Sequence, residues 1–90
     1  MVGTCRKIVR TKLNYIQWTG DNIEEFRNVF PNGLFDFDIC ENEALDMTED
    51  GTWTMYVPRG YFVVYDPLFN ESVVVVSEKD FNSYYEVYKR

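Results

Sequence analysis

One short stretch, residues 13–30, constrains the fold more than any other part of the chain. β-Branched and aromatic residues are interleaved with polar ones up to Trp18, which is typical of a half-buried strand. Gly20 then permits a sharp turn, and Asp21 followed by Glu24 has the D-x-x-E form of a helix N-terminal capping box. We therefore expect the chain to turn directly from a strand into a helix.

The predicted helix opens at about Asn22 and is amphipathic. Its apolar residues, Ile23, Phe26 and Phe30, recur at intervals of three and four, so they form one stripe. Pro31 disfavours helical geometry at the residue before it, and the helix should end there. A helix this short is marginal in isolation, so it needs a sheet to pack on.

Residues 34–57 contain three segments in which apolar and polar residues alternate, as they do in strands with one buried face. Glu41-Asn42 is interpreted as a tight turn, and Asp50-Gly51 supplies the positive φ angles of a hairpin. We expect two consecutive antiparallel hairpins here. The side chains expected to face the core are Phe35, Phe37, Ile39, Leu45 and Met47, and in the third segment Trp53, Met55 and Val57 share one side of the strand.

Segments 61–65 and 72–76 are apolar on both faces, which predicts central strands. Ser77 with Asp80 is a second helix start signal, and aromatic residues follow at helical spacing to cover the other face of the sheet. Residues 1–12 show no clear period and are interpreted as a basic N-terminal arm or the start of the first strand. The fold class is therefore α+β: one small domain, a mostly antiparallel sheet of about five to six strands, one helix after the first strand and a short C-terminal helix.

A chain of 90 residues forms a single domain and needs a dense core, which seven Phe, seven Tyr and two Trp can supply. Cys5 and Cys40 are isolated, so neither a zinc site nor a disulfide framework is indicated. No apolar run approaches the roughly 20 residues of a membrane span, and no signal-peptide pattern is present. These features favour an intracellular protein with no membrane partner.

The residue types that carry common enzyme chemistry are scarce in this sequence. The chain has no His, which excludes Ser-His-Asp, Cys-His and His-metal arrangements, and it has no phosphate-binding glycine motif. Asp36 and Asp38 alternate with core residues, as solvent-facing strand positions do, and Cys40 ends an apolar strand, where packing is the usual role. We therefore predict a protein that is not an enzyme, with no catalytic, metal or cofactor residues.

Charge is unevenly distributed along the chain, whose net charge is −6. Residues 1–12 contain four bases and no acid, whereas the segment 36–50 contains seven carboxylates and no base. A surface of such carboxylates repels nucleic acid and attracts proteins with basic grooves. The alternative is a solvated face that keeps an aromatic-rich protein soluble. The candidate partner-binding residues are Asp36, Asp38, Glu41, Glu43, Asp46, Glu49 and Asp50, with the aromatic neighbours Trp53 and Tyr56.

The segment from Tyr15 to Phe26 resembles a family of small uncharacterised proteins that are encoded by phages and prophages of Gram-positive bacteria. Members typically have an I-Q-W-x-G-x-N segment before a short helix, an acidic turn with Gly, a G-D-Y/W-I-I segment and a final F-x-x-x-Y-E. The matching residues here are Ile16 to Asn22, Asp50-Gly51, Gly60 to Val64 and Phe81 to Glu86. Two features depart from the family: no Asp follows Gly60, and Asp66-Pro67 replaces a G-x-K-G-E turn. The resemblance implies a phage origin and a small α+β fold, and it brings no catalytic residues.

Small acidic phage proteins without enzymatic activity are often inhibitors that occupy the nucleic-acid site of a host enzyme. The leading hypothesis is therefore an anti-defence or anti-CRISPR factor in the host bacterial cytoplasm. Its partner would be a host protein that binds nucleic acid, such as a CRISPR effector nuclease, and we expect no direct nucleic-acid binding. Two alternatives remain open: a structural or assembly protein that forms a homo-oligomer through an exposed sheet edge, and a small metal-dependent hydrolase or nuclease.

Overall fold

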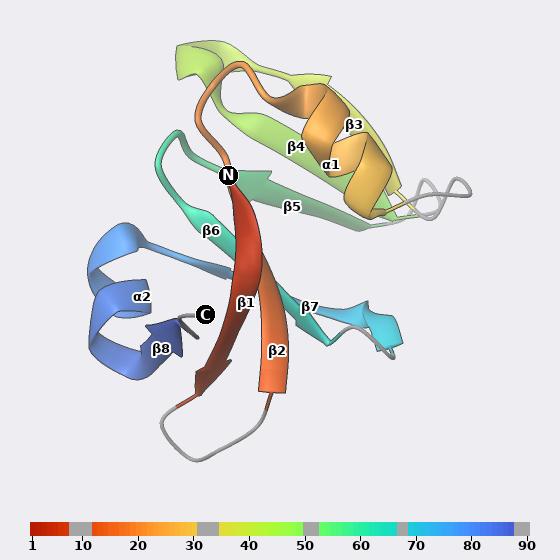
Figure 1. Ribbon diagram of the computed structural model, residues 1–90. Helices are drawn as coiled ribbons and strands as arrows, with labels where there is room; N and C mark the ends of the chain where they lie inside the picture. The colour runs from red at the N-terminus through yellow and green to blue at the C-terminus, as the bar shows by residue number, and fades with distance from the viewer. Residues whose placement is uncertain (8–11, 31–34, 50–52, 67–68, 88–90) are drawn as a thin grey trace.

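The computed structural model describes residues 1–7, 12–30, 35–49, 53–66 and 69–87 (Figure 1). It confirms a small α+β fold with mostly antiparallel strands, one helix in the first third of the chain and one near the C-terminus. The elements are β1 (Val2–Lys7), β2 (Lys12–Gln17), α1 (Ile23–Val29), β3 (Phe35–Ile39), the 3₁₀ turn η1 (Glu41–Glu43), β4 (Leu45–Glu49), β5 (Trp53–Val57), β6 (Phe62–Asp66), β7 (Phe69–Val76), α2 (Glu78–Tyr84) and β8 (Tyr85–Val87).

The strands form two separate sheets. The large sheet has five strands in the order β7-β6-β2-β1-β8, and the small sheet has three in the order β3-β4-β5. All neighbouring strands are antiparallel. Figure 1 shows the small sheet at the top with α1 against it, and the large sheet below, with α2 beside β8. Two sheets take the place of the one sheet expected from the sequence, and α1 follows the second strand instead of the first.

The N-terminal segment that was expected to be a basic arm or the start of the first strand contains a strand of its own. β1 pairs with β2 on one side and with β8 on the other, with Gly3 opposite Tyr15. A Cβ on Gly3 would lie 2.6 Å from the Tyr15 hydroxyl oxygen, so the ring occupies the space of a side chain. The alternation is hidden in the sequence because a glycine stands where an inward-facing apolar residue is usual.

The first hydrophobic core lies between the two sheets and α1. Trp18 and Phe26 meet edge to face with their centroids 5.6 Å apart, and Phe30 meets Tyr65 at 4.9 Å. Ring pairs of this kind contribute about 0.5–1.5 kcal/mol beyond the burial of their area. The buried members are Ile16, Trp18, Phe26, Phe30, Phe35, Phe37, Leu45, Met47, Met55, Val57, Val63 and Tyr65.

A second core lies on the other face of the large sheet, beneath α2. Ser77 begins this helix as predicted, because its side chain accepts a hydrogen bond from the Asp80 backbone N–H at 3.2 Å. Phe81 then stacks on Phe62 with the ring centroids 3.9 Å apart. Tyr84, which was expected to cover the sheet, is instead 60% exposed. The buried members of this core are Cys5, Tyr15, Phe62, Val64, Val76 and Phe81.

Two residues at strand ends are exposed, and for Ile39 this contradicts the expectation from the sequence. Ile39 and Trp53 have the parity of the buried face of the small sheet, yet their side chains are 53% and 52% exposed. Alternation fixes which face a side chain takes, and it does not fix how far the opposing layer extends. These two residues lie at the ends of β3 and β5, beyond the cover of the core.

Candidate functional site

The solvent-facing side of the small sheet brings together part of the predicted acidic surface. Strand register places Asp36 opposite Thr48, and Asp38 opposite Asp46. Thr48 in turn lies opposite Thr54, and Asp46 lies opposite Tyr56. The six side chains therefore form two rows of three on one face. We call this set, Asp36, Asp38, Asp46, Thr48, Thr54 and Tyr56, the acidic face.

Its second row places two carboxylates directly across from one another. Asp38 and Asp46 are register partners in the antiparallel β3–β4 pair, where Cβ atoms of opposed residues lie about 4.5–5.5 Å apart. Like charges in this arrangement destabilise a sheet. Tyr56 continues the row and is 53% exposed, so an aromatic ring lies beside the two carboxylates. The face offers negative charge and a flat apolar surface to a partner.

Cys40 borders the acidic face without supplying a nucleophile. Its Sγ donates to the Ala44 carbonyl oxygen at 3.4 Å and to Asp46 Oδ1 at 3.5 Å. Partial burial, followed by the Asp46 carboxylate, raises the pKa of the Cys40 thiol above its ordinary value. Burial likewise raises the pKa of Cys5 to about 11. Because the thiolate is the reactive form, both cysteines are suited to packing.

The remaining predicted carboxylates lie elsewhere. Glu43 forms an ion pair with Arg59, with Oε2 and Nη1 3.2 Å apart, and Glu41 is exposed in the same η1 turn. Glu49 and Trp53 are register partners, and alternation puts both on the side opposite to the acidic face. Asp50 lies outside the described residues. The structure therefore groups three of the seven predicted carboxylates with Tyr56 and places Glu41, Glu43 and Glu49 elsewhere.

The basic N-terminal segment lies away from the acidic face. Arg6 and Lys7 occupy the end of β1 and Lys12 the start of β2, both in the large sheet. In Figure 1 these strand ends are at the bottom of the molecule, whereas the small sheet is at the top. The described ends of β1 and β2 that contain the basic residues therefore lie at the opposite end of the domain from the small sheet.

The Ile16–Asn22 motif forms a second polar cluster, which we call the corner. Trp18 is fully buried, and its Nε1–H donates to the Glu43 backbone oxygen at 2.6 Å. Gly20 has a φ of +98°, and a Cβ there would lie 2.9 Å from Glu43 Oε2. Gln17 donates from Nε2 to the Gly60 oxygen at 3.1 Å. The motif therefore joins the β2–α1 connection to the η1 turn and to the β5–β6 turn.

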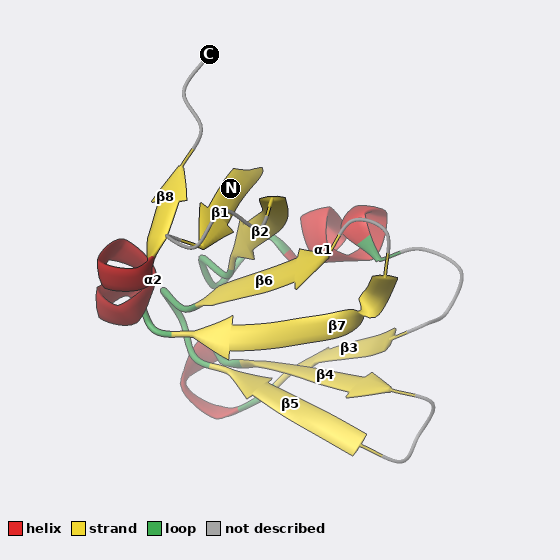
Figure 2. Ribbon diagram, turned by 90° about the horizontal axis from the view of Figure 1, so that it is seen from below, coloured by secondary structure: helices red, strands yellow, loops and turns green. Residues whose placement is uncertain are grey.

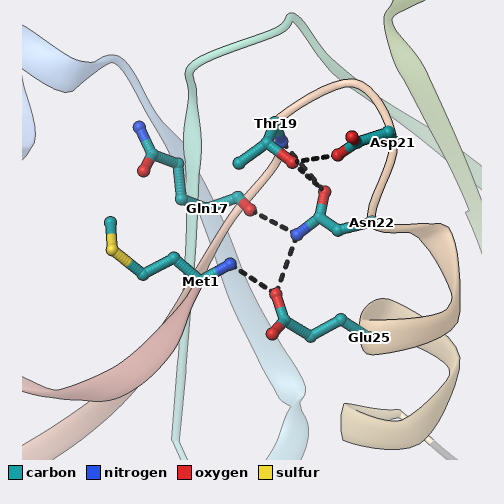
Figure 3. A network of polar contacts seen from close by, with 6 residues as sticks. All are labelled: Met1, Gln17, Thr19, Asp21, Asn22 and Glu25. Carbon is teal, nitrogen blue, oxygen red and sulfur yellow. Dashed lines mark hydrogen bonds and ion pairs between the residues drawn. The ribbon is translucent and has the colours of Figure 1, made fainter.

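Asn22 is the centre of the corner, as Figure 3 shows. Its Oδ1 accepts from the Thr19 backbone N–H at 2.9 Å, and its Nδ2 donates to the Gln17 oxygen and to Glu25 Oε1, both at 2.8 Å. The N-terminal ammonium of Met1 also pairs with Glu25. Hydrogen bonds from that ammonium and from Asn22 lower the pKa of Glu25. The side chain of Asn22 thus ties the helix to the preceding strand.

The predicted capping box is wrong. The N-cap of α1 is Asn22, and its side chain makes no cap hydrogen bond. Asp21 instead accepts from the Thr19 hydroxyl at 2.8 Å, and Glu24 pairs with Arg27. The D-x-x-E spacing was misleading because the polar residues of the turn bond backward, toward the strand. Sequence reasoning singled out this motif and did not find its role in holding the turns together.

Other classes of site receive no support from the described part of the chain. Within it there is no group of three or more His, Cys, Asp or Glu side chains that could hold a metal ion. None of its helices has the length and apolar character to cross a membrane. Comparison of the sequence with protein-family models and with curated proteins, and of the fold with solved structures, gives no significant match. The function is therefore inferred from geometry and charge.

Proposed function

We propose that this protein is a phage-encoded binding protein that inhibits a host nucleic-acid-handling enzyme through the acidic face. The observation that carries the proposal is the direct opposition of Asp38 and Asp46 on an exposed sheet face, with Asp36 on the same face. The pair costs stability in the free protein. A basic surface on a partner would convert that repulsion into attraction.

The alternative role for these side chains, solubility, does not require their arrangement. Solubility needs charges spread over the surface, and it is served equally well by carboxylates that are not opposed. No side-chain hydrogen bond or ion pair joins Asp36 or Asp38 to another residue in the described ranges, so both carboxylates remain available to a partner. Tyr56, half exposed in the same row, adds a residue type that is enriched at protein interfaces.

The partner class follows from the chemistry of the face. Two rows of side chains with three carboxylates complement the basic groove in which an enzyme holds a phosphate backbone. The resemblance to phage and prophage proteins supplies the setting, the cytoplasm of a bacterial host. CRISPR effector nucleases and DNA repair enzymes are the leading candidates. The proposed role needs no catalysis and no cofactor.

The test replaces the three aspartates by their neutral isosteres. The protein is used to capture an enzyme from host lysate, and the captured enzyme is then tested for binding to a labelled DNA duplex. We expect the wild-type protein to block DNA binding and the triple variant Asp36→Asn, Asp38→Asn, Asp46→Asn to lose the block. The block should also weaken with added salt, because the screening length falls from about 10 Å at 0.1 M to about 3 Å at 1 M.

A matched control removes the same amount of charge from other exposed sites: Asp21→Asn, Glu24→Gln and Asp80→Asn. This variant should block DNA binding as the wild type does. Equal inhibition by both triple variants would mean that net charge, and not the acidic face, is responsible. Full inhibition by the acidic-face variant would remove the proposal.

A further inference from the structure

β7 has the sequence of a central strand and the position of an edge strand. Val73 to Val76 are apolar on both faces, which predicts a neighbour on each side. β6, with the same kind of sequence, does lie between two strands and is buried on both faces. β7 pairs only with β6 and ends the large sheet. The prediction that both are central strands is therefore wrong for β7.

Between Val73 and Val76, the outer side of β7 lacks the usual protection of a sheet edge. Among the described residues no strand pairs with that side, and β5 approaches β7 without pairing to it (Figure 2). Natural edges are protected by Lys, Pro or a bulge, and Val73 to Val76 offer neither a charge nor a proline. β7 does contain Glu71 and a register shift against β6 at Tyr65/Asp66, but both precede Val73, and the stretch that follows is regular. Val74 is also 54% exposed.

We infer that β7 pairs with β7 of a second copy of this chain, so that the two large sheets join edge to edge in a symmetric dimer. Antiparallel pairing about a two-fold axis normal to the sheet keeps each face on its own side. Only residues of the same parity then oppose each other. With the axis at Val74, this residue faces Val74 of the second copy, and Val73 faces Val75. The half-exposed Val74 side chains become buried against one another.

Self-complementarity favours a second copy as the occupant, because the axis at Val74 places valine opposite valine and no like charges opposite one another. The net charge of −6 makes two copies repel each other, and this repulsion is weakest where no carboxylates are opposed. The stretch from Val73 to Val76 is uncharged, and the acidic face belongs to the other sheet. A basic partner is instead drawn to the acidic face, so the dimer leaves the proposed inhibitory surface open. The two inferences rest on different strands and can fail separately.

The first experiment compares oligomeric state by sedimentation velocity from about 1 µM to about 1 mM, a range that spans weak to moderate dimer affinities. We expect a concentration-dependent dimer for the wild type. Val74→Lys should raise the dissociation constant at least about tenfold, because two ammonium groups would then face each other across the axis. Thr54→Lys, an equal charge change at an exposed position of β5, should dimerise as the wild type does. A wild type that stays monomeric throughout, or equal behaviour of the two variants, would overturn the inference.

A second experiment does not depend on the charge variants folding well. In a Cys40→Ala background, Val74→Cys should form a disulfide between copies on mild oxidation, because opposed residues bring their Cβ atoms within reach. Thr54→Cys should not. In parallel, hydrogen exchange of the β7 amides in the unmodified protein should slow as concentration rises. An absence of both crosslinking and added protection would contradict β7 pairing. The proposed inhibition is independent of the dimer, so Val74→Lys should still block DNA binding by the captured enzyme as the wild type does.

Discussion

The corner and the acidic face both contain polar side chains, yet these side chains are used in opposite ways. In the corner, the Asn22 carboxamide makes four hydrogen bonds within the chain. On the acidic face, Asp38 and Asp46 are opposed, with no base between them. Polar side chains that are satisfied internally stabilise the fold, whereas like charges held together cost stability. The comparison separates residues that build the domain from residues that are available to a partner.

The largest expected effect is at Trp18, the buried ring of the corner. Trp18→Ala should cost roughly 3–5 kcal/mol of the free energy of unfolding, because it leaves a cavity. The total free energy of unfolding of a small domain is only about 5–15 kcal/mol. The variant should therefore unfold at a much lower urea concentration than the wild type. Trp18→Phe keeps most of the volume and leaves the Glu43 oxygen without its donor, so its loss should be smaller. Equal losses would show that the volume of the ring contributes nothing beyond its hydrogen bond to Glu43.

Replacement of Asn22 tests the hydrogen bonds of the corner alone. Asn22→Ala removes all four hydrogen bonds of the side chain, and we expect a loss of about 1–2 kcal/mol in the free energy of unfolding. Asn22→Asp keeps the acceptor for the Thr19 N–H, but it puts a carboxylate oxygen where Nδ2 donates to Glu25, so repulsion should make it less stable than Ala. Chemical denaturation of the three proteins measures the order. A stability of Asn22→Ala equal to that of the wild type would remove the distinction between the two regions.

In contrast to the two substitutions in the corner, Asp38→Asn should stabilise the protein. Removal of one charge from the opposed pair should raise the free energy of unfolding by about 0.2–1 kcal/mol. Asp36→Asn is the matched control, because Asp36 faces Thr48 and its replacement relieves no direct repulsion. The midpoint of thermal unfolding of both variants is the measurement. Destabilisation by Asp38→Asn would mean that this carboxylate has a structural role, and the acidic face would then resemble the corner.

The smallest effect concerns Glu25 and acid pH. Its pKa is lowered from 4.5 by hydrogen bonds from the Met1 ammonium and Asn22, so the carboxylate stabilises the fold above that value. This contribution is lost as the pH falls below 4.5 through the folded-state pKa. The difference in melting temperature between the wild type and Glu25→Gln should therefore be positive at pH 7 and shrink in acid. A pH-independent difference would show that the ion pair is not responsible.

Several elements could be derived from local sequence because their causes are local. The strand ending near Trp18, the helix ending at Val29 and the Ser77 cap each depend on a few adjacent residues. The alternation of β3 to β5 likewise placed Asp36, Asp38 and Asp46 on a solvent-facing side. Where the cause was distant, the prediction failed. The use of glycine at position 3 is explained only by the Tyr15 ring that lies against it, and Ile39 is exposed at the end of β3 although it has the parity of the buried face.

The sequence by itself determined that the chain is a small, acidic α+β domain whose core is built from aromatic rings, since composition and periodicity are properties of the chain alone. Only the tertiary structure decided that the strands divide into two sheets, that Asp38 opposes Asp46, and that β7 ends a sheet. These facts depend on which strands pair and in what register. Pairing between distant segments is set by the packing of the whole domain, and no local pattern specifies it.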